Sequence, residues 1–222
     1  MPHPGIVSAA ALRFDGIDLL RAAPRTLRQL RGKRIGLIMQ DPKYSLNPVK
    51  AVGAQIAEAA RLHGGANRAA AQRQTLEMLA AVQIRDPERV WAAYPHELSG
   101  GMAQRAMIAM MLVAGPDLLI ADEPTSALDV TVQDEVLALM KTLIRQRGMG
   151  LILISHDLRL VSRFCDRIVV MYAGRVMETL GAAGLDAARH PYTRGLLACL
   201  PDIDRAPGPL PTLQRDPAWM TA

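Results

Sequence analysis

Residues 118–124 read Leu-Leu-Ile-Ala-Asp-Glu-Pro, and this stretch decides the fold. Its first four residues form an apolar run that is typical of a parallel strand covered by helices on both faces. The run ends in two adjacent carboxylates, Asp122 and Glu123, and α/β proteins place their ligands at this end of a strand. Taken alone, the pair could also serve only to cap the segment that follows. The stretch predicts an α/β core with a candidate site at the strand's carboxyl end.

Strand and helix patterns extend outward from this stretch. Apolar runs predict strands at residues 12–14, 17–20, 35–39 and 151–154, and a hairpin formed by residues 168–171 and 175–178. Periodic apolar positions predict helices at residues 24–30, 49–62, 67–82, 101–113 and 132–147. This order predicts one α/β domain over residues 1–200, with a mostly parallel sheet. Residues 201–222 are Pro-rich and without periodicity, so we expect a loose tail there.

The composition is that of a soluble globular protein, with 50% hydrophobic and 21% charged residues among 222. No apolar run approaches the ~18–20 residues that cross a bilayer, and no basic residue precedes the short apolar run at residues 6–12. Cys165 and Cys199 lie far apart and share no metal-ligand spacing with a histidine. These features favour a protein that resides in the cytoplasm, without a disulfide framework.

The net charge of +5 is concentrated near the N-terminus, where residues 1–50 carry nine Lys or Arg against three acidic residues. A basic surface of this kind can face nucleic acid or anionic lipid. Only Phe14 and Tyr44 are aromatic in this segment, too few for a platform that stacks bases. We therefore favour a solvated face near a membrane, or simply a charged helix, over nucleic-acid binding.

Two further motifs flank the central strand. Residues 98–102 read Leu-Ser-Gly-Gly-Met and lead into a predicted helix, so that unshielded backbone N–H groups at the helix start can bind an anion. Residues 155–157, Ser-His-Asp, follow the second buried strand. A lone Ser-Gly-Gly is most simply an ordinary helix start. The three motifs in this order and at this spacing are very unlikely to arise by chance.

In this order the motifs resemble those of the nucleotide-binding subunits of ABC transporters. Residues 118–122 resemble the Walker B strand, and residues 98–102 the ABC signature, with Met102 where glutamine is common. Residues 126–129, Ser-Ala-Leu-Asp, resemble the D-loop. Gln40 resembles the Q-loop glutamine and His156 the switch histidine. The resemblance implies a P-loop NTPase-like ABC ATPase domain with a helical signature subdomain at about residues 49–113.

A finer resemblance is to the ATP-binding subunits of peptide and nickel importers. It rests on five motifs: Gln-Asp-Pro at 40–42, Ser-Leu-Asn-Pro at 45–48, Tyr-Pro-His-Glu at 94–97, His-Pro-Tyr-Thr at 190–193 and Gly-Leu-Leu at 195–197. Relatives in that branch often carry a Cys-rich segment after this point, and the shorter, nickel-like members do not. No such segment follows here. The pattern does not assign the substrate.

The resemblance implies ATP and Mg²⁺ as ligands and a role for each motif residue. Asp122 would hold Mg²⁺ through its water shell, and Gln40 would contact the metal and the attacking water. Glu123 would orient or deprotonate that water, and His156 would donate to the γ-phosphate. The signature residues Ser99, Gly100 and Gly101 would bind nucleotide. Asp129 would bridge to an opposite subunit or, equally, cap the helix that follows it.

The resemblance also implies partners and a location. Integral membrane permease subunits would dock a coupling helix in a groove lined by residues 43–60, although an ordinary surface loop and helix would look the same. A second ATPase subunit would complete a homo- or heterodimer, and an extracytoplasmic solute-binding protein would act indirectly. No nucleic acid is expected. The protein would lie peripherally on the cytoplasmic face of the inner membrane.

The Walker A pattern Gly-x₄-Gly-Lys-[Ser/Thr] occurs nowhere in the 222 residues, and Arg31-Gly32-Lys33-Arg34 lacks both the first glycine and the hydroxyl. In the family this loop, with its strand and helix, precedes the strand matched at 12–14. We therefore expect an N-terminally truncated ABC ATPase domain, from an internal start, a split gene or a decayed copy. About four hydrogen bonds to charged groups would be missing, worth ~1.5–3 kcal/mol each. The 222 residues alone should then neither bind nor hydrolyse ATP measurably.

Three functions remain open at this point. The first is a transport ATPase for peptides, nickel or similar small solutes. The second is a non-catalytic subunit that lends Ser99, Gly100 and Gly101 to a paralogous ATPase while its own site is inactive. The third is an ABC ATPase of DNA repair or translation. The motif at 190–197 and the absence of a long coiled-coil insertion argue against the third.

Overall fold

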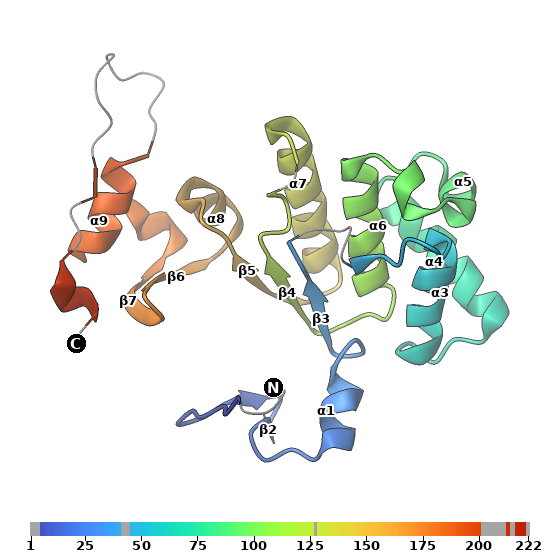
Figure 1. Ribbon diagram of the computed structural model, residues 1–222, viewed down its shortest axis with the longest axis horizontal. Helices are drawn as coiled ribbons and strands as arrows, with labels where there is room; N and C mark the ends of the chain where they lie inside the picture. The colour runs from blue at the N-terminus through green and yellow to red at the C-terminus, as the bar shows by residue number, and fades with distance from the viewer. Residues whose placement is uncertain (1–4, 41–44, 127, 201–211, 214–215, 221–222) are drawn as a thin grey trace. The chain divides into compact units, whose positions relative to one another are not determined.

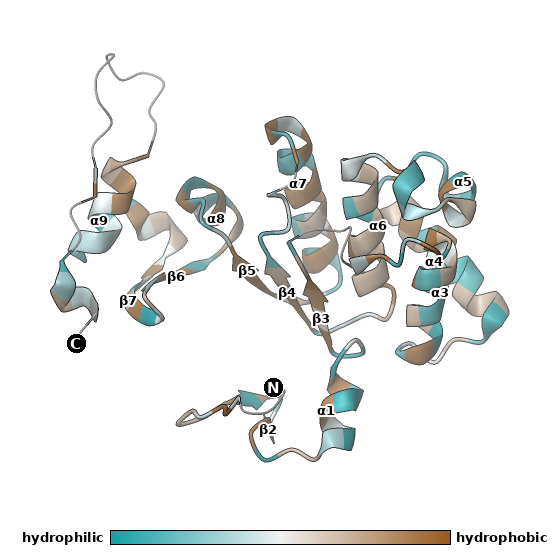
Figure 2. Ribbon diagram, in the orientation of Figure 1, coloured by the Kyte–Doolittle hydropathy of each residue, from teal (hydrophilic) through white to brown (hydrophobic). Residues whose placement is uncertain are grey.

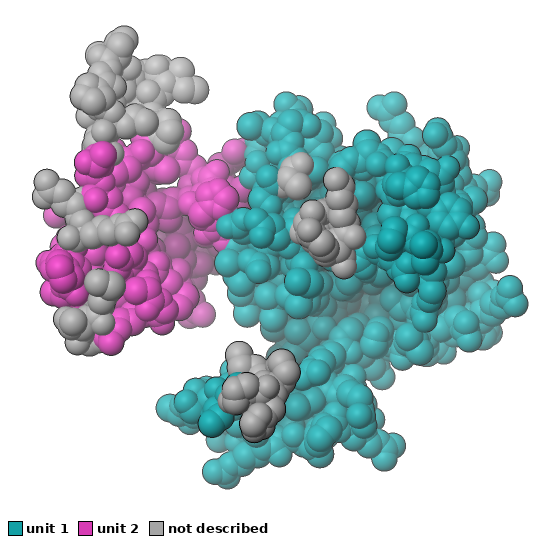
Figure 3. All heavy atoms as spheres, in the orientation of Figure 1, with its two compact units in different colours: residues 1–154 teal, residues 155–222 magenta. Residues whose placement is uncertain are grey.

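A computed structural model describes residues 5–40, 45–126, 128–200, 212–213 and 216–220. The chain divides into two compact units, Met1–Ile154 and Ser155–Ala222 (Figure 3). The first unit holds the strand that ends in the two carboxylates. Each unit is described on its own below.

The core of the first unit is a parallel sheet of three strands in the order β3-β4-β5 (Figure 1). The strands are β3 (Ile35–Ile38), β4 (Leu118–Asp122) and β5 (Gly150–Ile154). Their register aligns Leu37, Ile120 and Ile152 across the sheet. Because parallel strands end at the same edge, the loops after all three strands leave from one side. The predicted parallel α/β core is confirmed.

The two faces of this sheet differ in burial. Helix α6 (Gly100–Leu112) packs against β3 and against α7 (Val130–Gln146), and on this face Ile38, Leu119 and Ala121 are fully buried. On the opposite face Leu37 is 48% exposed and Ile152 is 49% exposed. Figure 2 shows the apolar character of these strands. Within the part of the chain that the structure describes, no further strand pairs with β5.

Helices fill the chain between β3 and β4. They are α3 (Val52–Leu62), α4 (Arg68–Ala81), α5 (Pro87–Ala92), the 3-10 helix η1 (Pro95–Glu97) and α6. α3 packs against α4, α5 and α6, and its Ile56 is fully buried. The side chain of Asn67 accepts the Ala70 N–H and so caps α4. The sequence analysis did not predict α5, a helix of only six residues.

The chain before β3 forms a short hairpin, β1 (Arg13–Phe14) and β2 (Ile17–Asp18), followed by α1 (Pro24–Leu30). The predicted strand, turn and helix are confirmed. Arg34 pairs with Asp117, just before β4, and its guanidinium lies 2.8 Å from the carboxylate of Asp15 in the hairpin turn. Hydrogen bonds to Asp117 and then to Asp15 raise the pKa of Arg34. This ion-pair cluster joins the hairpin to the base of the sheet.

The second unit contains α8 (Leu158–Phe164), the strands β6 (Arg167–Tyr172) and β7 (Arg175–Gly181), the 3-10 helix η2 (Ala182–Ala187), α9 (Pro191–Ala198) and the 3-10 helix η3 (Pro217–Met220). β6 and β7 pair antiparallel around Ala173 and Gly174, whose φ angles are +48° and +79°. The predicted hairpin is confirmed. α8 and α9 were not expected from the sequence.

The described end of the chain packs within the second unit. The ring of Trp219 lies 5.5 Å from that of Tyr192 and 6.0 Å from that of Tyr172, centroid to centroid. Leu213 packs where a side chain on Gly195 would stand. The expectation of a loose tail is therefore wrong for these residues. Residues 201–211, 214–215 and 221–222 of the predicted tail lie outside the described part.

Glu178 of β7 holds the turn that begins α9. Its carboxylate accepts the backbone N–H of Arg189 at 2.8 Å and that of His190 at 3.3 Å. The Arg189 N–H is the main cause that keeps the pKa of Glu178 below its ordinary value. Glu178 thus serves the packing of the second unit.

Candidate functional site

Gln40 and Glu123 meet at the carboxyl edge of the sheet. Gln40 follows β3 and Glu123 follows β4, and the two strands are neighbours in the sheet. The Nε2 of Gln40 donates a hydrogen bond of 2.8 Å to Oε2 of Glu123. We call Gln40, Asp122 and Glu123 the strand-edge site. Asp41 and Pro42 of the predicted motif lie outside the described residues.

The backbone of Glu123 is unusual. Its φ is +43°, in the left-handed region that costs a non-glycine residue on the order of 1–3 kcal/mol in total. Its N–H still donates to the carbonyl of Ile154 at 2.9 Å, so the pairing of β4 with β5 runs one residue past the strand. The carbonyl of Glu123 then accepts from the backbone and hydroxyl of Ser126. Strain held by surrounding bonds at a strand end is typical of a functional position.

Asp122 is the last residue of β4 and is exposed. Within the described residues, no group of three or more His, Cys, Asp or Glu side chains could hold a metal by itself. An exposed carboxylate beside a second one still suits Mg²⁺, because this ion binds through one or two carboxylates, waters and substrate phosphates. The donor set of the strand-edge site therefore fits the predicted Mg²⁺.

A second group of motif residues lies at the start of α6. Ser99 is the N-cap of this helix, and its Oγ accepts the N–H of Met102 at 3.3 Å. Gly100 and Gly101 are the first two helical residues. We call Ser99, Gly100 and Gly101 the helix-start turn. A helix start of this kind directs free N–H groups and a partial positive charge toward solvent, where an anion can bind.

Asp129 begins α7 in the same manner. Its Oδ1 accepts the N–H of Val132 at 3.0 Å, which confirms the predicted N-cap role. Its predicted contact with an opposite subunit stays a prediction, and Ala127 of the predicted D-loop lies outside the described residues. A Cβ built on Gly100 would lie 3.8 Å from Leu128. The helix-start turn therefore lies beside the segment that begins α7.

His156 belongs to the second unit and is exposed. It stands in a turn where Asp157 caps α8 by accepting the Leu160 N–H, while the Asp157 N–H donates to Oγ of Ser155. The predicted switch histidine is thus presented by a well-bonded turn directly after β5. Its contact with a nucleotide stays a prediction.

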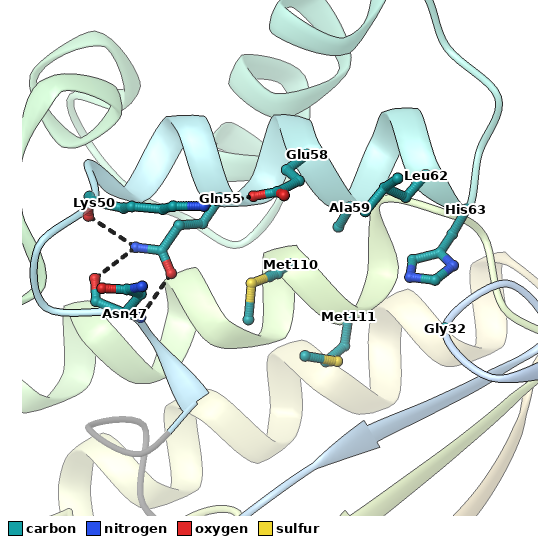
Figure 4. A pocket seen from close by; sticks show the side chains of 10 residues that line it. All are labelled: Gly32, Asn47, Lys50, Gln55, Glu58, Ala59, Leu62, His63, Met110 and Met111. Atoms are coloured by element: carbon teal, nitrogen blue, oxygen red, sulfur yellow. Dashed lines mark hydrogen bonds and ion pairs between the residues drawn. The ribbon is translucent and has the colours of Figure 1, made fainter. Parts of the chain in front are cut away.

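A cavity of about 330 Å³ opens between α3 and the end of α6 (Figure 4). The buried Gln55 shapes its rim: it accepts from the N–H of Asn47 and donates to the carbonyls of Asn47 and Lys50. At the other end, His63 occupies the space that a side chain on Gly32 would need. These residues overlap the predicted permease groove, residues 43–60, of which Lys43 and Tyr44 lie outside the described part.

Sequence reasoning did not identify Gln55 or His63. One polar residue at an inward position of a helix gives no motif. Gln55 was detectable only as an exception to the apolar face of residues 49–62.

No helix among the described residues combines the length and the apolar character needed to cross a membrane.

Comparison with known proteins identifies the family. The sequence model of the family described as ABC transporter matches residues 5–126, more than half of the chain. The probable peptide ABC transporter ATP-binding protein y4tR of Sinorhizobium fredii is 50% identical over an alignment of 210 residues, and the match covers 90% of this chain and 63% of the relative. The dipeptide transport ATP-binding protein DppD of Haemophilus influenzae is 48% identical over 96% of this chain and 64% of its own. The chain thus spans somewhat less than two thirds of these relatives.

Solved structures show the same fold. The ATP-binding cassette MJ0796, as a dimer bound to ADP and Pi, superposes with a TM-score of 0.67 at 26% identity, covering 76% of this chain and 72% of that one. CbiO1 from Clostridium perfringens, part of the transporter complex cbiONQ, gives a TM-score of 0.69 at 26% identity over 86% of this chain and 73% of its own. The predicted α/β ABC ATPase fold is confirmed. The chain belongs to the ABC transporter family.

Proposed function

We propose that the protein is the ATP-binding and ATP-hydrolysing subunit of an ABC importer for peptides. The observation that carries the proposal is the hydrogen bond between Gln40 and Glu123. It joins, across two neighbouring strands, the two side chains that this family places beside the attacking water. The names of the relatives, which are peptide and dipeptide transport proteins, support peptides. Nickel, the other substrate class considered from the sequence, has no such support.

Glu123 acts on the water that attacks the γ-phosphate. Its carboxylate orients this water and accepts its proton, a role that contributes about 10²–10⁴-fold in comparable enzymes. Gln40 fixes the carboxylate by donating from Nε2 to Oε2, and its amide oxygen is an acceptor for the water or for a hydrated cation. The left-handed backbone of Glu123 fixes the direction in which its side chain leaves the strand.

The remaining motif residues act on the phosphates. Asp122 would hold Mg²⁺, which would neutralise phosphate charge when ATP is bound. Ser99, Gly100 and Gly101 offer the start of α6 to the nucleotide of a second ATPase subunit, and Asp129 approaches the same interface. His156 donates to the γ-phosphate as negative charge develops there.

The proposed partners are permease subunits, a second ATPase subunit and, indirectly, an extracytoplasmic solute-binding protein. The cavity beside α3, whose rim is fixed by the hydrogen bonds of Gln55, is the proposed binding site for a coupling helix of the permease. The protein would then lie on the cytoplasmic face of the inner membrane. No nucleic acid is part of the proposal.

The test is uptake and hydrolysis by the intact protein, as the cell makes it and together with its permease, because the 222 residues alone are expected to hydrolyse no ATP. Cells that lack the protein should lose uptake of a labelled dipeptide but keep uptake of nickel, and the purified complex should hydrolyse ATP with Mg²⁺. If nickel uptake were lost and dipeptide uptake kept, the proposal that the substrate is a peptide would be overturned. Hydrolysis that requires an added paralogous ATPase, and that Ser99→Ala but not Glu123→Gln abolishes, would favour the alternative of a subunit that only lends its helix-start turn.

A further inference from the structure

Arg105 lies on α6, four residues after Gly101, and only 12% of its side chain is exposed. Its guanidinium makes three bonds, to three different acceptors. Nη1 donates to the carbonyl of Val82 at 3.1 Å and to Oε1 of Gln83 at 3.0 Å. Nη2 donates to Oε2 of Glu135 on α7 at 3.0 Å. This one side chain therefore connects α6 to the end of α4 and to α7.

The contact with α4 is made at the end of that helix. Val82 is the C-cap of α4, and Gln83 follows with a φ of +60°. The last carbonyls of a helix lack partners within it and carry a partial negative charge, which a cation stabilises. Arg105 supplies this cation from a neighbouring helix. The end of α4 and the middle of α6 are thus held together by a charged group that is largely shielded from water.

α6 contacts α7 at two places, and the bond between Arg105 and Glu135 is one of them. One turn before the Arg105–Glu135 pair, a Cβ built on Gly101 would lie 2.9 Å from Cγ1 of Val132, closer than such carbon atoms normally approach. Val132 is β-branched and stiff, so it has little freedom to move aside. α6 therefore lies against α7 at Gly101 and is bonded to it at Arg105. Two contacts one turn apart fix both the distance and the rotation of α6.

We propose that Arg105 is a positioning residue for the helix-start turn. It acts through α6: by bonding α4 on one side and α7 on the other, it sets the rotation at which Ser99, Gly100 and Gly101 are presented. The role in ATP turnover rests on the function proposed above, whereas the mechanical role does not. Arg105 reaches no nucleotide in this account.

The chain offers a matched control in Arg147, which stands just after α7. Its Nη1 donates to the carbonyl of Leu112 at the other end of α6, and its Nη2 to Sδ of Met78. Both arginines therefore bond a helix-end carbonyl and connect α6 with α4. Arg147, however, is anchored about one helix length away from the helix-start turn.

The experiment compares Arg105→Met with Arg147→Met in the intact protein by hydrogen–deuterium exchange and by ATP turnover. Arg105→Met should speed exchange of the amides of residues 102 and 103 about 10-fold, because both are hydrogen-bonded to Ser99 and local opening of these bonds sets their protection. It should also lower ATP turnover about 10-fold, because small displacements of binding groups are costly. Arg105→Lys, which keeps the charge, should recover part of both. Arg147→Met should leave the amide exchange and the ATP turnover near the wild-type values, even if it lowers the melting temperature as much as Arg105→Met does.

Unchanged exchange at residues 102 and 103 in Arg105→Met would overturn the proposal. So would equal losses in the two variants that scale with their melting temperatures, because that result describes general destabilisation. If Arg105→Met does not fold, Glu135→Gln removes the bond to α7 alone, and it must then speed exchange at the same amides. Faster exchange in a protein that hydrolyses no ATP would support the positioning role while overturning the function proposed above.

Discussion

The strand-edge site and the helix-start turn are held in place by different means. Gln40, Asp122 and Glu123 stand at the ends of paired strands, and their positions follow from backbone hydrogen bonds along the sheet. Ser99, Gly100 and Gly101 stand at the start of α6, and their position follows from the contacts of this helix with α7, through Val132 beside Gly101 and through Arg105 one turn further along.

This difference indicates where each region is vulnerable. The strand-edge site depends on the packing below the sheet, because the backbone ladder keeps its register only while its apolar face stays covered. The helix-start turn depends on the interface between α6 and α7, where one added methyl group or one lost charge can shift its position. Substitutions at Leu119, at Gly101 and at the two helix caps test these dependences, in order of decreasing expected effect, and one at Lys50 tests a contact outside both regions.

Leu119→Ala should have the largest effect on stability. Leu119 is fully buried under α6 in the central strand, so its truncation should cost about 2–5 kcal/mol of unfolding free energy. Ile152→Ala is the control on the opposite face, where the side chain is 49% exposed, and it should cost less than half as much. Denaturant unfolding of both variants measures the difference. Equal costs would show that the two faces are equally covered in the protein.

Gly101→Ala should damage the helix-start turn through Val132. The added methyl group meets Cγ1 of Val132, and we expect ATP turnover to fall about 10-fold as the turn shifts. Val132→Ala alone should change turnover less than about threefold, and it should restore most of the loss when combined with Gly101→Ala. Absence of any recovery in the double variant would mean that Gly101 is needed for another reason.

Ser99→Ala and Asp129→Ala should each remove one helix cap. Both side chains accept a backbone N–H three residues on, so each loss should cost about 1 kcal/mol of unfolding free energy. Ser99→Asn and Asp129→Asn keep an acceptor and should retain most of the stability. Thermal unfolding measures the four variants. A cost in Asp129→Asn as large as in Asp129→Ala would argue that Asp129 does more than cap α7.

Lys50→Ala gives the smallest expected effect and tests a contact outside both regions. Its Nζ lies 3.3 Å from Oε2 of Glu58, and both side chains are 52% exposed. An exposed pair of this kind contributes about 0–1 kcal/mol, so stability should change within that range. A larger loss would indicate that the Lys50–Glu58 pair at the rim of the cavity contributes more to the free energy of unfolding than its exposure suggests.

The sequence predicted the strand-edge site better than the helix-start turn. Apolar runs located β3, β4 and β5, and the resemblance assigned Gln40 and Glu123 to the same attacking water. Parallel strands bring their carboxyl ends to one edge, which accounts for the hydrogen bond between these two side chains. Ser99 was also found, because its motif is local. The residues that hold its helix, Arg105 and Val132, could not be found, since a contact between residues 22 to 31 positions apart leaves no pattern in a single sequence.

The short helices show a second limit. α5, α8 and α9 have six to eight residues, about two turns or fewer, so apolar periodicity is a weak signal in them. Their local signals were the caps Asp86, Asp157 and His190 and, in α5 and α9, a proline in the first turn, and both kinds of residue are also common at ordinary turns. The ring cluster around Trp219 likewise joins residues from three elements of the second unit and follows from tertiary packing alone.

The most direct test of the account is ATP turnover by the intact protein carrying Glu123→Gln, with Glu178→Gln as the control. Both side chains accept hydrogen bonds, but only Glu123 stands in the strand-edge site. Glu123→Gln should bind ATP and lose at least about 100-fold in turnover, because its amide accepts no proton from water. Glu178→Gln should stay within about threefold of wild type. Turnover near the wild-type rate in Glu123→Gln would contradict the account.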